Sequence, residues 1–242
     1  MRTARWSSAS RIVSYLFVVV LLAGCASTKV TERQILDPQR KLPRPDRILV
    51  YDFAATPADV PADSELTGHP DVQQTPQTAE QIEAGRQVGA EIAAKLADEI
   101  RSLGLPAEHA SAGAMPRIND IVIRGYLLSV EEGSRAKRLA IGFGAGKSQL
   151  SVAAEGYQMT AQGLRKLGSG TMEAGGSKGP GAAVPLAVAI ATANPVGLIV
   201  SSGMKVYGEA SGKSKIEGRA KDVAKAIVEE MKPRLRQQGW IE

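Results

Sequence analysis

Residues 47–54 have the sequence RILVYDFA, and residues 78–103 have the sequence TAEQIEAGRQVGAEIAAKLADEIRSL. The first stretch is apolar at odd and even positions alike, so it predicts a central strand that is covered on both faces of a sheet. The second stretch opens with a capping box, Thr78 to Gln81, and predicts a helix that ends before Gly104. Its inward stripe, spaced by threes and fours, is Ile82, Gly85, Gly89, Ile92, Leu96, Ile100 and Leu103. The two glycines of the stripe would let the helix backbone approach a sheet closely.

Four further strands are predicted downstream of this helix. They cover residues 105–110, 118–131, 148–160 and 164–174. The last two are separated only by residues 161–163 and are typical of a hairpin. With the strand at 47–54 and the helices, they predict one α+β domain over residues 47–242. Its architecture is a small mixed or antiparallel sheet of about five strands with helices packed on it.

The C-terminal part of the chain favours helices. Asn194 followed by Pro195 is typical of a helix start, and Ser214 to Glu217 has the spacing of a second capping box. A helix from Pro195 would place on one stripe Val196, Ile199, Val200, Gly203 and Tyr207. The final helix would bury the stripe Ile216, Ala220, Val223, Ile227, Met231 and Leu235. A kink is expected in this last helix at Pro233.

The N-terminus has the three parts of a secretory signal. Residues 1–11 carry three arginines and no acidic residue, residues 12–23 are an apolar run, and small residues follow. The run is too short to span a membrane. It ends in Leu-Ala-Gly24-Cys25, which resembles the lipobox cut by the lipoprotein signal peptidase. We therefore expect residues 1–24 to be removed between Gly24 and Cys25, and Cys25 to become an N-palmitoyl, S-diacylglycerol cysteine.

The residues after the predicted cleavage site are expected to hold the protein on a membrane. Residues 25–46 are polar, contain three prolines and show no periodicity, which predicts a lipidated N-terminus and a flexible tether. Ala26 rather than an aspartate follows the cysteine. In a Gram-negative source this predicts sorting to the outer membrane, with the domain facing the periplasm. Cys25 is the only cysteine, so the domain would have no disulfide, thiolate metal site or thiol nucleophile.

The charge of the chain argues against nucleic acid as a partner. The full sequence has 30 basic and 25 acidic residues, a formal net charge of +5. Three of the arginines lie in residues 1–24, so the mature chain keeps a net charge of only +2. That surplus is too small for a surface that follows a phosphate backbone, and no basic patch with interleaved aromatic residues accompanies it.

Three short motifs resemble enzyme signatures but lack their required partners. Residues 144–148 (GAGKS) resemble a phosphate-binding loop, but Ile141 stands where its first glycine belongs, and no nucleotide is expected. Residues 175–179 fit a nucleophile elbow around Ser177, but both histidines precede it in the chain. Ser202 and Lys205 have the spacing of penicillin-binding enzymes without their companion motifs. No enzyme, cofactor or catalytic residue is therefore predicted.

A long acidic loop carries one of the two histidines. Residues 55–77 contain four prolines and no Lys or Arg, which predicts either a functional flap or a disordered loop. Its acidic residues are Asp59, Asp63, Glu65 and Asp71. Together with His69 they match no metal template, so no metal site is predicted. His109 is expected on a strand. Glu131 and Glu132 are adjacent, so on a strand they would point to opposite faces.

An uncharged segment near the C-terminus leaves two interpretations open. Residues 179–204 carry no charge and are long enough for a membrane span, but their prolines, Asn194 and Gly197 break one continuous helix. The segment would form either a helical hairpin packed in the core or an element inserted in the membrane. The stripe from Pro195 onward favours packing, so residues 26–242 are expected to stay soluble without detergent.

The sequence resembles a known family of bacterial lipoproteins. The stretch DIVIRGYLLSVEEGSRAKRLAIGFGAGKSQLSVAAEGYQ at residues 120–158, the stretch GSGTMEAGGS at residues 168–177 and the ILVYDF strand resemble domain of unknown function 4410. The resemblance covers about residues 47–242 and implies no activity, cofactor or catalytic residue. By element order it is also similar to the small α+β domain of the curli secretion channel and of lipoprotein activators of peptidoglycan synthases.

Two functions remain compatible with these features. The first is a periplasm-facing accessory lipoprotein whose domain binds another envelope protein or itself. The alternative is a subunit of an oligomeric envelope pore or secretion assembly, with residues 179–204 in its membrane part.

Overall fold

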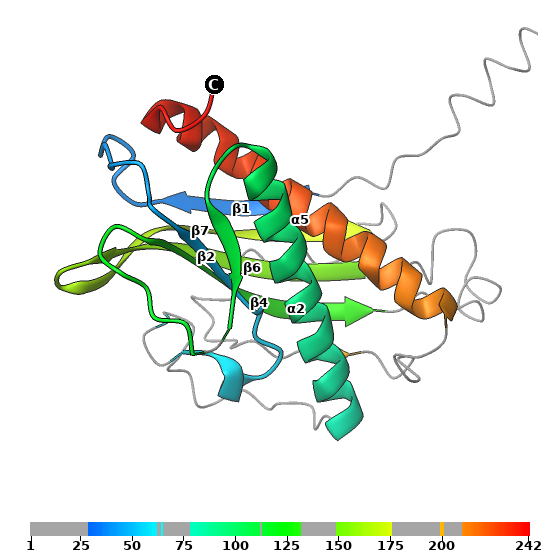
Figure 1. Ribbon diagram of the computed structural model, residues 1–242. Helices are drawn as coiled ribbons and strands as arrows, with labels where there is room; N and C mark the ends of the chain where they lie inside the picture. Colours follow the sequence, from blue (N-terminus) through cyan, green and yellow to red (C-terminus); the bar gives the residue numbers. More distant parts are fainter. Residues whose placement is uncertain are drawn as a thin grey trace, which may run out of the picture.

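The computed structural model describes residues 29–61, 64, 78–111, 113–131, 149–175, 199–200 and 210–242. These residues form a mixed sheet with two long helices packed on it (Figure 1). The predicted α+β class is thus confirmed. Gly24 and Cys25, and with them the predicted signal peptide, lie outside the described residues.

Within the described ranges, the sheet has six strands in the order β1-β7-β6-β4-β2-β3, and a short seventh strand pairs with β4 off this path. About five strands were expected. Their bounds are β1 Lys29–Ile35, β2 Ile48–Tyr51, β3 Ala107–Ala110, β4 Ile121–Glu131, β6 Gln149–Thr160, β7 Gly163–Gly175 and β8 Ile199–Val200. The pairs β1/β7, β7/β6 and β6/β4 are antiparallel, whereas β4/β2, β2/β3 and β4/β8 are parallel. The predicted hairpin is the β6–β7 pair.

The predicted central strand is β2, which lies between β4 and β3. Ile48, Leu49 and Val50 are each 0% exposed, as expected for a strand that is apolar on both faces. After β2 the chain passes through Phe53 and a short 3-10 helix, η1 (Pro57–Asp59), before the next described element.

Helix α2 (Ala79–Ser102) begins with the predicted capping box. The backbone N–H of Gln81 donates to the Thr78 hydroxyl at 3.2 Å, and the Thr78 N–H donates to the Gln81 side chain at 2.9 Å. Gly104 follows the helix with a φ of 76°, which favours glycine. The close approach predicted for the glycine stripe holds at Gly89, where an added Cβ would lie 2.1 Å from the carbonyl oxygen of Phe53.

Helix α5 (Ala210–Gln238) packs beside α2 on the same face of the sheet (Figure 1). Ala220, Val223, Ile227 and Leu235 of its predicted stripe are buried in the same core as Ile92 and Leu96 of α2. The helix begins five residues earlier than a cap at Ser214 predicts, so Ser214 and Glu217 lie inside it and the predicted capping box is wrong. Pro233 lies within the helix, where it removes one backbone donor from the last turns.

Residues 29–46 do not form the expected flexible tether. Residues 29–35 are strand β1, which pairs with β7 from Lys29–Glu173 to Ile35–Gly168. The prediction failed because β1 is an edge strand. Main-chain hydrogen bonds to a single neighbour, β7, hold the strand in place. Its sequence, KVTERQI, is therefore polar, because an edge strand needs few apolar side chains.

The helix predicted from Pro195 is also wrong at its centre. Ile199 and Val200 form strand β8, parallel to β4 beside Ser129 and Val130. Both are β-branched residues, which suit a pleated strand better than a helix. Asn194 and Pro195 themselves lie outside the described residues, as does the rest of residues 179–204.

The acidic loop is in part packed on the sheet. Ala55, Thr56 and Ser64 are 0%, 8% and 4% exposed, so the first part of residues 55–77 is not a structureless loop. Ala54 continues the parallel pairing of β2 by bridging Tyr126 in β4. His69, Asp63, Glu65 and Asp71 lie outside the described residues.

Candidate functional site

A cavity of about 380 Å³ lies between α5 and the sheet, at the end formed by β1, β7, β6 and β4. Its interior is apolar. The side chains that line it include Ile121 and Ile123 of β4, Met172 of β7, Ile227 and Leu235 of α5, and Trp240. All six are less than 9% exposed, and they belong to the main hydrophobic core. The cavity is therefore a hollow within the core that opens at its edge.

Glycines in β6 and β7 account for the hollow. Ile123 of β4 faces the helices and pairs with Gly156 of β6, which in turn pairs with Gly168 of β7. Cross-strand partners share a face, so Ile123 is the only side chain that this row presents to α5. A Cβ at Gly168 would lie 2.5 Å from the Gln34 carbonyl oxygen of β1, so the open part of the row is at Gly156. Gly170, which pairs with Ala154 two pairs further along, also lines the cavity. A Cβ added at Gly156 would meet no atom within 4 Å, so the space above it is open.

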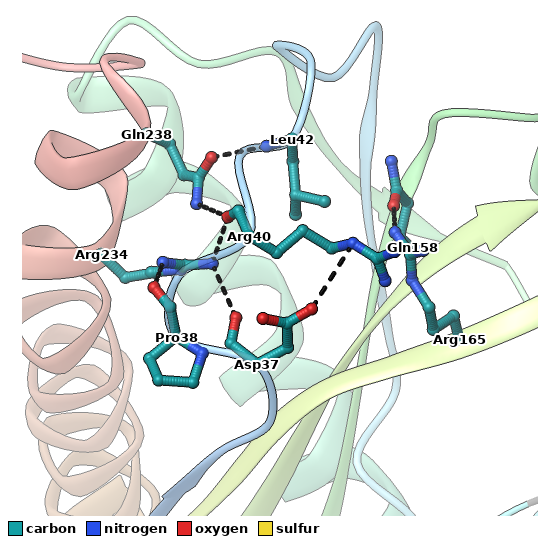
Figure 2. A network of polar contacts seen from close by, with 8 residues as sticks. All are labelled: Asp37, Pro38, Arg40, Leu42, Gln158, Arg165, Arg234 and Gln238. Carbon is teal, nitrogen blue, oxygen red and sulfur yellow. Dashed lines mark hydrogen bonds and ion pairs between the residues drawn. The ribbon is translucent and has the colours of Figure 1, made fainter.

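Residues 36–46, which we call the strap, close one side of the cavity (Figure 2). Arg234 of α5 donates to the backbone oxygens of Pro38 and, at 2.7 Å, of Arg40. Gln238 uses both ends of its amide: it accepts from the Leu42 N–H at 2.7 Å and donates to the Arg40 oxygen at 2.8 Å. Polar side chains of α5 thus satisfy strap backbone groups that no strand pairs.

Arginines outnumber carboxylates around the mouth of the cavity. Arg33 pairs with Glu230 at 3.4 Å, and Arg40 pairs with Asp37 at 3.6 Å. Arg165 and Arg234 have neutral oxygens as their hydrogen-bond partners, Gln158 Oε1 for Arg165 and the strap carbonyls for Arg234. Figure 2 shows the Arg40 side chain extending from the strap toward Arg165 and Gln158. The mouth therefore has a local surplus of positive charge.

Among the described residues, two buried N–H groups beside the cavity have no hydrogen-bond partner. They are Arg165 Nε and Trp240 Nε1, and both residues line the cavity. Trp240 is 7% exposed. Buried donors usually have a partner, so two at one cavity are unusual.

On the opposite face of the sheet, a buried carboxylate is fully hydrogen-bonded. Glu155 Oε2 accepts from the hydroxyls of Ser64, Tyr126 and Tyr157 at 3.1, 2.9 and 2.8 Å. Lys166 Nζ lies 3.0 Å from Glu155 Oε1. Burial, with the negative charge of Glu155 added to it, raises the pKa of both tyrosines, so they remain neutral donors. We call this group the Glu155 cluster.

A second polar group fastens η1 to α2. Asp59 Oδ1 lies 2.8 Å from Arg86 Nη2, and Asp59 Oδ2 accepts from the Thr56 N–H and hydroxyl at 3.0 and 2.8 Å. Burial raises the pKa of Asp59, but the hydrogen bonds from Arg86 and Thr56 outweigh it, and the pKa lies below its ordinary value.

Of the residues singled out from the sequence as possible site residues, only a few lie within the described residues. His109 lies on β3 as predicted, where its Nε2 is 2.5 Å from Asp52 Oδ1 at the surface. Glu131 ends β4, and Glu132 lies outside the described residues. Residues 144–148, Ser177, Ser202 and Lys205 also lie outside them. Within the described ranges, no three His, Cys, Asp or Glu residues are placed to hold a metal ion.

The residues of the cavity were not found from the sequence. In the sequence, three glycines of the predicted hairpin have no distinguishing feature: Gly156, Gly168 and Gly170. Only the register of the strands shows that they share a face of the sheet. Arg234 and Gln238 precede the chain end by a few residues and look like the polar face of a helix. One signal in the sequence could have indicated the cavity: these glycines stand in the strands of the hairpin at positions where a buried face would normally carry apolar side chains.

Comparisons with known proteins place the chain in a family and give distant structural likenesses. The family described as Domain of unknown function (DUF4410) matches residues 48–193, more than half of the chain. Among curated proteins none matches significantly. Two crystal forms of the PelC dodecamer from Paraburkholderia phytofirmans, one a point variant, are 15% and 14% identical, with a TM-score of 0.35 each. In each case 71% of this chain and 98% of that chain are covered.

Proposed function

Since the chain belongs to the family Domain of unknown function (DUF4410), which carries no assigned activity, we propose a function from its own residues. The protein is a lipid-anchored envelope lipoprotein that acts by binding another envelope protein and not by catalysis. It is held on the periplasmic side of the outer membrane by acyl chains on Cys25. The observation that carries this proposal is the position of β1.

Strand β1 begins at Lys29, and only three residues separate it from Cys25. Four peptide units span at most roughly 14 Å, so a lipidated Cys25 would keep the domain against the membrane surface. A lipoprotein with a long tether can reach across the periplasm, whereas this one would act close to its own leaflet. A fixed position of that kind suits an accessory protein that meets a membrane-bound partner.

The described polar groups support binding over catalysis. In the Glu155 cluster both carboxylate oxygens are occupied by neighbours of the fold, which leaves the carboxylate no geometry for accepting a substrate proton. The ion pair of Asp59 and Arg86 joins η1 to α2 in the same structural manner.

Strand β8 favours the accessory protein over the pore. Ile199 and Val200 are hydrogen-bonded to the end of β4, so this part of the uncharged segment belongs to the sheet of the domain. Among the described helices, neither is both long and apolar enough to cross a bilayer. A subunit of an oligomeric pore remains the second candidate.

The connection between β3 and β4 offers a surface for a protein partner. Met115 and Ile118 are 84% and 66% exposed, the most exposed large apolar side chains among the described residues. Both residues lie in one short connection between strands, and exposed apolar side chains grouped in this way are typical of protein-binding surfaces.

Site-specific photo-crosslinking in intact cells tests the proposal. A photoreactive residue is placed at Met115 or Ile118, with the exposed Gln87 on α2 as the matched control. We expect one discrete heterologous band from the first two positions and none from Gln87. A ladder at multiples of the chain's own mass would support the pore instead. In parallel, Cys25→Ser should abolish lipid labelling and leave an uncleaved precursor. A variant that is still labelled would overturn the anchor.

A further inference from the structure

We propose that the cavity between α5 and the sheet binds one acyl chain, and that the anionic headgroup of this lipid lies against the arginines at its mouth. This inference goes beyond protein binding and does not depend on the partner. It rests on four observations: the size of the cavity, its glycine floor, its charge and its unpartnered donors.

The size and lining of the cavity suit a small apolar ligand. Its volume of about 380 Å³ falls within the range of small-molecule sites, and such sites are mostly apolar with a few polar groups at fixed places. Aliphatic side chains, Met172 and Trp240 form the walls. An apolar space that stays empty costs stability, whereas an apolar ligand that fills it stabilises the folded protein.

The glycine floor makes the hollow a property of the sheet and not of loose packing. Ile123 is buried to 96%, and yet its cross-strand partner Gly156 has no atom within 4 Å of an ideal Cβ position. Any larger residue at position 156 would fill this space from below. The φ of Gly156 does not lie in the left-handed region, so the backbone itself would accept a side chain there.

The charge at the mouth selects an acidic headgroup. Arg33, Arg40, Arg165 and Arg234 line the cavity together with Asp37 and Glu230, a local surplus of two positive charges. The other charged pair of the lining, Lys166 with Glu155, is joined within the Glu155 cluster on the far face. Guanidinium groups match the geometry of carboxylate and phosphate oxygens, so either headgroup would serve.

The unpartnered donors point to the same kind of ligand. Arg165 Nε and Trp240 Nε1 are buried N–H groups that find no acceptor in the part of the chain that the structure describes, and both residues line the cavity. The oxygens of a carboxylate or a phosphate ester would supply acceptors to such donors. A purely apolar ligand would leave them unsatisfied.

A photoactivatable fatty acid in living cells tests the inference on the full chain. The acid carries a diazirine in its chain and a terminal alkyne, and the purified protein is mapped by peptide mass spectrometry. We expect adducts that require irradiation on the peptides with Met172, Met231 or Trp240, all of which line the cavity. Label on Cys25 forms without irradiation and reports the lipid anchor separately. The anchor and the cavity site are therefore tested independently, and one can be disproved while the other holds. The adduct mass shows whether the chain belongs to a free acid or to a phospholipid, and both support the inference.

A pair of glycine variants supplies the matched control. Gly156→Phe fills the cavity, and Gly218→Phe adds the same side chain to an exposed position of α5 where a Cβ also meets no atom within 4 Å. We expect the cavity adducts to fall at least about tenfold in Gly156→Phe, the loss of roughly one buried apolar group's contribution, and to stay unchanged in Gly218→Phe. The proposed binding site would be overturned by equal yields of cavity adducts in the two variants. It would also be overturned if the peptide with the exposed Met115 were labelled as strongly as the cavity peptides.

A second comparison tests the headgroup and remains informative if Gly156→Phe fails to fold. The acid is compared with the uncharged alcohol of the same chain length. In the parent protein we expect the acid to label the cavity about tenfold more than the alcohol, as for a hydrogen bond to a charged group. Arg165→Gln should bring the two close to equal, because it removes a charge and an unpartnered donor. Equal labelling by acid and alcohol in the parent would overturn the anionic headgroup.

Discussion

On the face of the sheet away from the helices, each oxygen of the buried Glu155 carboxylate has a donor. On the face toward α5, strands β6 and β7 leave a hollow, and two N–H donors of residues that line it have no acceptor among the described residues. Glu155 and Gly156 are neighbours in the chain, so a single strand supports both arrangements by the alternation of its side chains. The Glu155 cluster, with all its hydrogen bonds made within the protein, therefore stabilises the fold. The cavity, with its unpartnered donors, is the site that we propose for a lipid. The following predictions test this difference, from the largest expected effect to the smallest.

Glu155→Gln should cause the largest loss of stability, about 3–5 kcal/mol of the free energy of unfolding, because it leaves Lys166 charged and buried without its carboxylate. Urea unfolding followed by circular dichroism measures it. Glu229→Gln, at a carboxylate that is 66% exposed, is the control and should change stability far less. Similar losses in the two variants would mean that the Glu155 cluster does not hold the far face together.

Gly89→Ala should destabilise the contact between α2 and the sheet by about 1–3 kcal/mol, because the new Cβ would lie 2.1 Å from the Phe53 oxygen. Gly218→Ala makes the same change where the Cβ meets open space, and should stabilise α5 by about 0.5–1 kcal/mol. Thermal unfolding of both variants gives the comparison. A neutral Gly89→Ala would contradict the close approach of α2 to the chain after β2.

Gln238→Ala should loosen the strap. It removes the acceptor of the Leu42 N–H and one donor to the Arg40 oxygen, at a cost of about 1–3 kcal/mol. Limited proteolysis should then cut within residues 36–46, where the parent protein resists. Gln237→Ala, at an exposed neighbour that also bonds the strap through Pro38, is the control. Cleavage at the same rate in both variants would show that Gln238 does not close the cavity.

Acid should release η1 from α2, with the smallest effect of the four. The folded-state pKa of Asp59 is lowered, so its contribution is present above the unfolded pKa of about 3.9 and is lost as the pH falls through the lower folded value. The stability of Asp59→Asn should therefore fall below that of the parent near neutral pH and converge with it in acid. Urea unfolding at pH 7 and at the lowest pH where the protein stays folded checks the sign. A difference that grows in acid would contradict it.

The elements that the sequence predicted well are those with one buried face and a clear period. Strand β2 and helix α2 each carry their pattern within a single stretch, and the capping box at Thr78 marks the start of the helix. Strand β1 was missed because an edge strand needs little apolar surface. The helix expected at Pro195 failed because Ile199 and Val200 found a partner in β4, a contact far away in the sequence.

The Glu155 cluster and the cavity, which lie on opposite faces of β6, could not have been predicted from the sequence either, because both depend on contacts between residues far apart in the chain. Ser64, Tyr126 and Glu155 meet only through the fold, and nothing local in the sequence joins them. The cavity is defined by missing side chains, and a glycine in a strand looks the same whether it opens a hollow or admits a neighbour. Gly168 admits a neighbour, since an added Cβ would lie 2.5 Å from the Gln34 oxygen, whereas Gly156 opens the hollow.

Fluorescence of Trp240 tests the central difference between the two faces most directly. The chain has two tryptophans, and Trp6 lies in the predicted signal peptide, so the processed, lipidated protein has Trp240, a wall of the cavity, as its sole reporter. In proteoliposomes, a fatty acid brominated in mid-chain should quench this fluorescence in a saturable manner, because its bromines would lie beside the indole. Gly156→Phe should remove the saturable part, and Gly218→Phe should retain it. Quenching that never saturates, or that is equal in the two variants, would contradict a binding site between α5 and the sheet.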